Sequence, residues 1–161
     1  AILGLGYLPQ ETSIFRGMTV EQNINSVLEM VEPDAETRAA ELERLLDEFG
    51  LTRLRASPAM ALSGGERRRC EIARALAAKP TLLVSDEAMA GLSSSEVDEI
   101  LEILMTLNEH GLAVIMIEHI MRAVMRFSQR IVVLDAGQKI AEGTPEEIVQ
   151  NPDVERAYLG E

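Results

Sequence analysis

Short apolar runs alternate with one-face helical patterns along much of this chain. Runs at 81–85, 112–117 and 130–135 are apolar at successive positions, which is typical of parallel strands buried on both faces. Between the first two, one face of a predicted helix at 94–109 carries Val97, Ile100, Leu101, Leu104 and Leu107. Strand, helix, strand, helix and strand in this order predict two successive right-handed βαβ units.

Four capping boxes mark where helices begin. In each, a Ser or Thr precedes a Glu or Gln by three residues, and the two side chains satisfy amides of the first turn. The boxes are Thr19/Gln22, Ser63/Glu66, Ser93/Glu96 and Thr144/Glu147. Gly50 and Gly111 stand where helices end, and Pro80 ends the helix that Ser63 begins. The last box, with Pro145 at the first helical position, follows a predicted short edge strand at 139–142.

The segment at 19–60 has a different pattern. It is acidic, shows helical periodicity near 20–31 and 35–49, and contains no convincing strand. A predicted strand at Leu5–Leu8 precedes it. We therefore expect a small α-helical subdomain inserted between an N-terminal strand and the βαβ core.

Composition narrows the class of protein. The chain has 161 residues, of which 47% are hydrophobic and 26% charged, as in one globular domain. Its net charge of -12 disfavours non-specific nucleic-acid binding. The single cysteine, Cys70, cannot form an internal disulfide, which favours a reducing compartment. No apolar run approaches the roughly 20 residues of a membrane span.

The charge is unevenly distributed. Residues 51–80 carry seven Lys or Arg and two Asp or Glu, whereas residues 1–50 carry three and ten. A basic segment in an acidic chain indicates either a solvated helix surface or an anion bound nearby.

Two carboxylates, Asp86 and Glu87, follow the apolar run at 81–85. Ligands of parallel sheets bind at the carboxyl ends of the strands. There, Asp86 can hold Mg²⁺ through water, and Glu87 can orient or deprotonate an attacking water. An acidic pair after a strand is also common at the start of a turn, so the pair alone does not decide between these interpretations.

A glycine-rich helix start lies at 62–66. Ser63 is the predicted cap, and Gly64 and Gly65 carry no Cβ, so a hydroxyl, bare amides and the positive end of the helix dipole are open to an anion. Three arginines at 67–69 add positive potential. The alternative is an ordinary capped helix with a solvated Arg face.

Two further polar residues follow predicted strands. His119 comes after the run at 112–117, at the same sheet edge as the acidic pair, and Gln10 comes after Leu5–Leu8. A lone His in this place is usually a loop residue, and a lone Gln carries little information.

The order of these features resembles the ATP-binding-cassette (ABC) ATPases over essentially the whole chain. The string LSGGE at 62–66 is highly specific, and its distance before the acidic strand fits that family. The resemblance implies a P-loop NTPase-type α/β fold, with a parallel sheet flanked by helices and an inserted α-helical subdomain. It assigns a Q-loop glutamine to Gln10, the signature motif to 62–66, the Walker B pair to Asp86 and Glu87, and the switch histidine to His119.

The resemblance also implies ATP and Mg²⁺ as cofactors. In a complete family member, two ATPase domains pack head to tail around two ATP molecules. In such a pair, Ser63, Gly64, Gly65 and Glu66 would bind the nucleotide held by the partner domain. Gln10 and Asp86 would bind Mg²⁺. Glu87 would be the general base, and His119 would position the attacking water.

Further partners follow from the same resemblance. Residues 19–60 are expected to dock on transmembrane permease subunits, which places the protein in the cytoplasm, peripheral to the inner face of the bacterial inner membrane. Neither nucleic acid nor direct membrane insertion is expected.

Two groups within the family are represented. Residues 6–15 and 62–74 look like the ATPase of bacterial lipopolysaccharide export, whereas residues 89–161 look more like branched-chain amino-acid importer ATPases. The mixture fits an intermediate member or a chimera, and it leaves the transported substrate and the direction of transport open.

The sequence departs from the family in three places. Neither a G-x-x-x-x-G-K-[ST] phosphate loop nor the family's adenine-stacking aromatic precedes Gln10. Ala88 stands where Pro is usual, and Ser93 or Ser94 where Asp is common. We therefore expect a partial domain that is inactive alone, divided into a strand and Q-loop at 1–18, the helical subdomain at 19–60 and the βα core at 61–161.

Three functions fit these features. The first is an energy-coupling subunit of a membrane transporter. The second is an ATPase of DNA repair or chromosome structure, which the short segment between Gln10 and Ser63 and the acidic charge disfavour. The third is a non-catalytic dimerising or docking module that keeps only the signature half.

Overall fold

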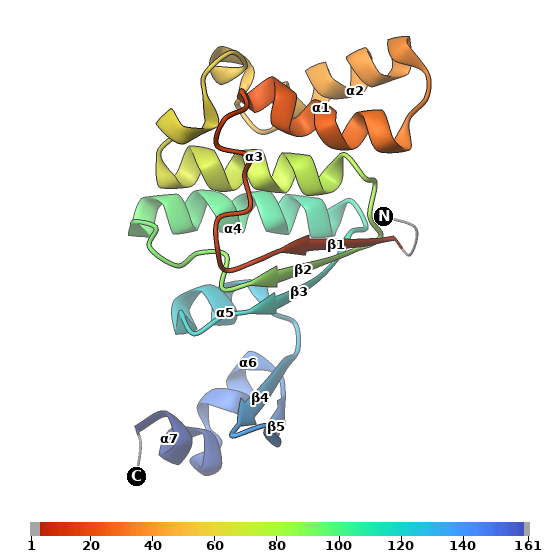
Figure 1. The fold of residues 1–161 in the computed structure, drawn as a ribbon. Coiled ribbons are helices and arrows are strands. Elements are labelled where there is room, and N and C mark those ends of the chain that lie inside the picture. The colour runs from red at the N-terminus through yellow and green to blue at the C-terminus, as the bar shows by residue number, and fades with distance from the viewer. Residues whose placement is uncertain (1–3, 160–161) are drawn as a thin grey trace. The chain divides into compact units, whose positions relative to one another are not determined.

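The computed structural model describes residues 4–159, and the chain divides into two compact units, Ala1–Glu118 and His119–Glu161. The first unit contains β1 (Leu5–Leu8), α1 (Val20–Val31), α2 (Ala35–Glu48), short 3₁₀ turns at Thr52–Leu54 and Ala59–Ala61, α3 (Gly64–Leu76), β2 (Leu82–Asp86), α4 (Ser94–Glu109) and β3 (Ala113–Ile117) (Figure 1). The second contains α5 (Met121–Phe127), β4 (Ile131–Asp135), β5 (Gln138–Gly143), α6 (Pro145–Val149) and α7 (Pro152–Leu159). Residues 1–3 and 160–161, which the predicted partial domain includes, lie outside the described residues.

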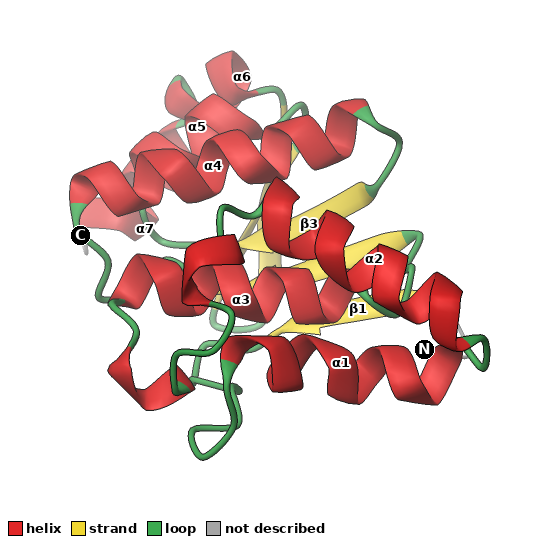
Figure 2. Ribbon diagram, turned by 90° about the horizontal axis from the view of Figure 1, so that it is seen from above, coloured by secondary structure: helices red, strands yellow, loops and turns green. Residues whose placement is uncertain are grey.

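The first unit is built on a parallel sheet in the order β1, β2, β3. Helices α3 and α4 cover one face of the sheet, α1 packs on α3, and α2 packs on α1 (Figure 2). The α/β class, the helices predicted near 20–31 and 35–49, and the first predicted βαβ unit are therefore confirmed.

The two faces of this sheet differ in burial. Leu8, Leu83 and Ser85 point toward α3 and α4 and are buried. On the alternate positions, Tyr7 is 53% exposed and Ile115 50% exposed. The prediction that the strands are buried on both faces is wrong for β3, because both helices of this unit that contact the sheet pack on the same side.

The second predicted βαβ unit is also wrong. β4 does not continue the parallel sheet but pairs antiparallel with β5, with Asp135 opposite Gln138. The two residues between them, Ala136 and Gly137, have φ values of +46° and +80°. Positive φ at both central positions is the type I′ turn that closes a two-residue hairpin, so the chain returns on itself at once.

The helix boundaries follow the predicted signals. All four capping boxes form, with the Ser or Thr side chain accepting the amide three residues on and the Glu or Gln side chain accepting the cap amide. Gly50 and Gly111 follow α2 and α4 with φ of +63° and +96°, the left-handed conformation that glycine adopts without steric cost.

The core of the first unit is aliphatic, as the scarcity of aromatic residues requires. Its fully buried large side chains include Leu8, Ile24, Leu45, Leu51, Ile72, Leu83, Ile100, Leu101 and Leu104. Cys70 lies among them with no exposed surface, and burial raises the pKa of its thiol to about 12. Within residues 4–159, no helix combines the length and the apolar character that crossing a bilayer demands.

We expect Cys70 to be inert to thiol reagents in the folded protein. Alkylation requires an accessible thiolate, and burial withholds both access and ionisation. The rate of Cys70 alkylation, followed by mass spectrometry, should be about 10³-fold or more lower in native buffer than in urea, since only the unfolded fraction reacts. A Met30→Cys variant, at a position 83% exposed, is the control and should label at once. Rapid native labelling of Cys70 would contradict the packing of α3.

Candidate active site

The carboxyl edge of the parallel sheet gathers residues from two distant parts of the chain. Gln10 Nε2 donates a 2.7 Å hydrogen bond to Glu87 Oε2. Beside it, the Tyr7 hydroxyl donates a 2.9 Å hydrogen bond to Asp86 Oδ2. The structure thus brings together Gln10, Asp86 and Glu87, as the sequence predicts, while the roles of these residues stay predictions.

Tyr7 is a member of this group that sequence reasoning missed. Its hydrogen bond to Asp86 is the main cause of a raised pKa of the Tyr7 hydroxyl, and desolvation and the charge of Asp86 act in the same direction. The available signal was strand alternation: in register, Tyr7 lies opposite Val84, two residues before Asp86 on the same face.

The turn after β2 holds Glu87 in an unusual backbone conformation. Its φ is +43°, in the left-handed region that non-glycine residues rarely adopt. The Glu87 amide donates to the carbonyl of Ile117 at 2.8 Å, and the Met89 amide donates to Glu118 Oε1 at 3.0 Å. The end of β3 therefore fixes the turn that carries the candidate base.

The signature segment forms the start of α3, as predicted. Ser63 Oγ accepts the Glu66 amide at 3.2 Å, and Glu66 Oε2 accepts the Ser63 amide at 2.8 Å. Glu66 is thus engaged in the cap of its own helix.

The interpretation of bare amides at this helix start needs a correction. The Gly65 amide already donates a 2.8 Å hydrogen bond to Glu96 Oε1 at the start of α4. A Cβ on Gly65 would lie 3.0 Å from the Glu96 side chain, and one on Gly64 would lie 3.0 Å from Leu92. The two glycines allow Leu92 and Glu96 to lie close to the start of α3. The Gly65 amide, which was predicted to be open to an anion, is already bonded to the Glu96 carboxylate.

The basic segment has a structural explanation that neither of the two predicted interpretations included. Arg68 and Glu71 on α3 form a buried ion pair at 2.9 Å, with side chains 8% and 1% exposed. Arg68 also donates to the carbonyl of Pro9, and Glu71 accepts the amides of Ser13 and Ile14. These charges bind the segment that contains Gln10 to α3.

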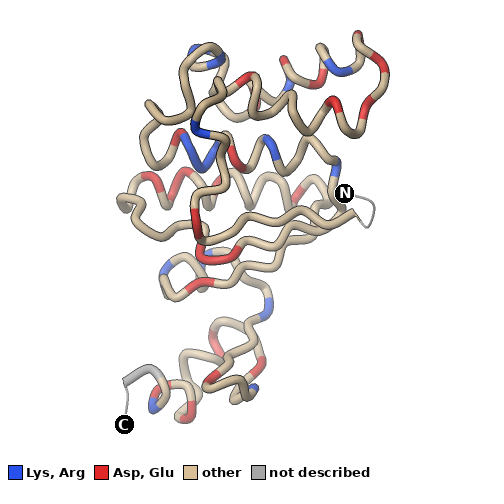
Figure 3. The backbone as a smooth tube through the Cα atoms, in the orientation of Figure 1, with Lys and Arg blue, Asp and Glu red and all other residues tan. Residues whose placement is uncertain are grey.

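Two further arginines of α3 also have partners within the chain. Arg74 donates to Ser13 and lies over the ring of Phe15, 4.9 Å from its centroid. Arg69 pairs with Glu99 at 3.2 Å. Figure 3 shows the basic positions along α3, with acidic residues on the surrounding elements of this unit.

His119 opens the second unit, two residues after the end of β3. The register of β2 and β3 pairs Asp86 with Ile117. The chain therefore leaves the sheet at Glu118, beside Asp86 and Glu87. The position of the predicted switch histidine after a strand is confirmed, and its role stays a prediction.

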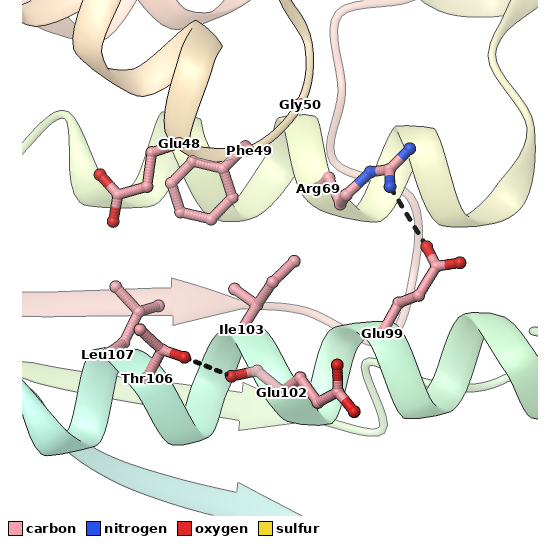
Figure 4. A pocket seen from close by; sticks show the side chains of 9 residues that line it. All are labelled: Glu48, Phe49, Gly50, Arg69, Glu99, Glu102, Ile103, Thr106 and Leu107. Carbon is pink, nitrogen blue, oxygen red and sulfur yellow. Dashed lines mark hydrogen bonds and ion pairs between the residues drawn. The ribbon is translucent and has the colours of Figure 1, made fainter.

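A separate pocket of about 410 Å³ lies between α2, α3 and α4 (Figure 4). Phe49, Ile103 and Leu107 contribute its apolar lining, and Arg69, Glu99 and Glu102 contribute charges. It contains none of the predicted site residues, so the sheet edge is the stronger candidate.

Comparison with known proteins gives the family. Residues 3–90 match the family described as ABC transporter, and residues 138–161 match the branched-chain amino acid ATP-binding cassette transporter family. The chain belongs to the ABC transporter family. The resemblance stated from the sequence is thereby confirmed, and the second match agrees with the likeness of the C-terminal part to branched-chain amino acid transporter ATPases.

Curated relatives cover the whole chain. It is 49% identical over all 161 residues to a probable ABC transporter ATP-binding protein of Azorhizobium caulinodans, of which it spans 57%. It is 43% identical to the lipopolysaccharide export system ATP-binding protein LptB of Haemophilus influenzae, over 98% of this chain and 66% of LptB. The likeness to lipopolysaccharide export ATPases therefore extends beyond the N-terminal half.

Solved structures of ABC proteins share the fold. The structure of cbiO1 from Clostridium perfringens, part of the ABC transporter complex cbiONQ, superposes with a TM-score of 0.85 at 25% identity, over 96% of this chain and 62% of cbiO1. An ATP-binding cassette in its ADP conformation gives a TM-score of 0.82 at 26% identity, over 98% of this chain and 69% of that protein.

We expect the contact between Glu96 and the signature helix to make stability depend on pH. The Ser93 amide, the Ser93 hydroxyl and the Gly65 amide all lower the pKa of Glu96. Because its folded pKa lies below the unfolded value, Glu96 contributes stability above the unfolded pKa, and this is lost as pH falls through the folded pKa. Glu96→Gln should therefore destabilise near pH 7, and its difference from wild type should shrink toward about pH 3.

Urea unfolding midpoints over this pH range measure the effect. Glu109→Gln, at the opposite end of α4, is the matched control. An unchanged midpoint for Glu96→Gln at neutral pH would show that the negative charge of Glu96 carries no stability.

Proposed function

We propose that this protein is the ATP-binding and ATP-hydrolysing subunit of a bacterial ABC transporter. The observation that carries the proposal is the Gln10–Glu87 hydrogen bond beside Asp86, which assembles an amide and two carboxylates at a parallel-sheet edge. Family membership and relatives named as ATP-binding proteins support it. The same similarities to transporter proteins favour transport over DNA repair.

Glu87 is the proposed general base. Its carboxylate accepts a hydrogen bond from Gln10, and the attachments of its turn hold the side chain at the strand end. A carboxylate placed there can accept a proton from the water that attacks the γ-phosphate. His119 is proposed to help position that water.

The donor set at the edge fits Mg²⁺. Asp86 offers a carboxylate and Gln10 a side-chain carbonyl, and Mg²⁺ prefers such oxygen ligands with water and substrate phosphates completing its shell. Among residues 4–159, no group of three or more His, Cys, Asp or Glu side chains is arranged to hold a metal ion. When bound, Mg²⁺ would neutralise charge on the phosphates.

The start of α3 is proposed to face the nucleotide of a second ATPase domain packed head to tail. Ser63, Gly64 and Gly65 would supply the hydroxyl and amide donors there. Since the Gly65 amide is bonded to Glu96, its use for phosphate requires that Glu96 release it. Glu66 supports this motif by capping the helix.

The phosphate loop is the part of the proposed site that this sequence lacks. No G-x-x-x-x-G-K-[ST] string occurs in the 161 residues, and the chain spans 57% and 60% of the first two curated relatives. Without those amides and that Lys, the β- and γ-phosphates lose their main anchors. We propose that these residues alone do not hydrolyse ATP, so that activity belongs to a longer chain.

An apolar surface beside the Gln10 segment is the proposed contact with transmembrane subunits. Phe15 is 50% exposed, Met18 40% and Met60 71%. The Ala59 amide donates to the Met18 carbonyl at 2.9 Å, so Met18 and Met60 lie on adjacent backbone. This surface is at the start of the helical segment 19–60, and its partner would hold the protein at the inner face of the inner membrane.

In the full-length protein, Glu87→Gln should lower the ATP turnover number by about 10² or more while leaving ATP binding intact, because the amide cannot accept the proton. Steady-state hydrolysis and gel filtration with ATP measure the two effects, and ATP-bound dimers should accumulate. Glu109→Gln, an exposed change of the same kind, is the control. Wild-type turnover by Glu87→Gln would remove the proposed base.

A charge placed in the apolar surface should separate partner binding from nucleotide binding. We expect Met18→Glu and Met60→Glu to reduce co-purification of the transmembrane subunits with the full-length protein, because a carboxylate loses hydration in an apolar contact. Met30→Glu is the matched control, since Met30 is 83% exposed at the other end of α1. Equal co-purification of all three variants would contradict this surface.

A further inference from the structure

The turn that carries Glu87 is attached to the end of β3 at two neighbouring positions. The Glu87 amide donates to the main-chain carbonyl of Ile117, and the Met89 amide donates to the side chain of Glu118. Between these bonds, Ala88 and Met89 are 1% and 0% exposed. The first attachment belongs to any pair of parallel strands, whereas the second depends on the identity of one side chain.

Glu87 needs such attachments because its backbone is strained. A non-glycine residue in the left-handed region places its Cβ close to the backbone carbonyl oxygen, and the φ of Glu87 is +43°. Such a conformation persists only when surrounding bonds hold it. If the turn relaxed, the Glu87 carboxylate would move away from Gln10.

Glu118 is placed to connect the two parts of the site. Its Oε1 holds Met89, and its Oε2 is a buried atom that has no hydrogen-bond partner in the described part of the chain. Burial lowers the pKa of Arg68, and the carboxylates of Glu71 and Glu118 oppose that shift, so Glu118 lies within electrostatic reach of Arg68. Arg68 in turn donates to the carbonyl of Pro9, directly before Gln10.

We propose that Glu118 is a positioning residue for Glu87: by holding the Met89 amide, it keeps the candidate base beside Gln10. The inference rests on the proposed ATP hydrolysis and adds a residue to which the sequence analysis assigned no role. Glu118 acts through the turn and needs no contact with the nucleotide.

The test compares Glu118→Ala with Glu118→Gln in the full-length protein. Alanine removes the acceptor of the Met89 amide, whereas glutamine keeps an oxygen at the same reach. Glu118→Ala should lower kcat by about 10- to 100-fold with KM for ATP within about twofold, because misplacing a reacting group affects turnover more than binding. Glu118→Gln should stay within about threefold of wild-type kcat.

Controls separate positioning from folding and from the proposed function. Thermal melting reports whether each variant folds, and Glu109→Ala is the matched surface control. Wild-type kcat in a folded Glu118→Ala variant would overturn the positioning role, as would loss of kcat in Glu118→Gln equal to that in Glu118→Ala. If Glu118→Ala does not fold, Glu118→Asp replaces it, since aspartate withdraws the carboxylate by one methylene: lower kcat at unchanged KM supports the role, and wild-type kcat contradicts it.

The outcome for the wild-type protein distinguishes the two proposals. Suppose that the wild-type protein hydrolyses ATP, that Glu87→Gln abolishes this hydrolysis and that Glu118→Ala keeps the wild-type kcat. Only the positioning role of Glu118 is then rejected. Absence of ATP hydrolysis by the wild-type full-length protein rejects the proposed function and, with it, this role.

Discussion

The candidate site depends on the register of the parallel sheet. Because Leu8 lies opposite Ser85 and Asp86 opposite Ile117, three strands far apart in sequence end at the same level. The meeting of Tyr7 with Asp86 and of Gln10 with Glu87 at that edge follows from this alignment. A shift of one residue in β1 would turn Tyr7 to the opposite face and move Gln10 away from Glu87, since side chains alternate along a strand.

A second constraint lies behind the edge, in the charged face of α3. The Arg68–Glu71 pair is almost wholly buried, and it holds Pro9, Ser13 and Ile14 by their backbone groups. Removing one partner of such a pair typically costs about 3–5 kcal/mol, because the other charge is left buried alone. The helix that begins with the signature segment thus also fixes the segment of Gln10, so the two motifs are mechanically connected within one unit.

Glu96 connects the start of α4 to the start of α3 in the same unit. This side chain caps α4 and also accepts the Gly65 amide at the start of α3. The glycines that characterise the motif make this approach possible, since a Cβ on either would crowd Leu92 or Glu96. A sequence motif read as an anion site is therefore also a packing site, and both demands favour glycine at the same positions.

The sequence by itself determined the starts of four helices, the first βαβ unit and the family. Capping boxes and turn glycines act within a few residues, and the motif order from Gln10 to His119 needs no structure to be recognised. The strand that pairs with the run at 130–135 was not predicted, because an apolar strand does not indicate which strand it pairs with. The two-residue turn at Ala136 and Gly137 pairs this run with β5. Only the tertiary structure revealed that Tyr7 bonds Asp86, that the arginines of α3 bind the chain itself, and that Glu118 holds Met89. Such contacts join residues far apart in sequence, and their energies depend on burial and distance, which arise only when the sheet and helices have packed.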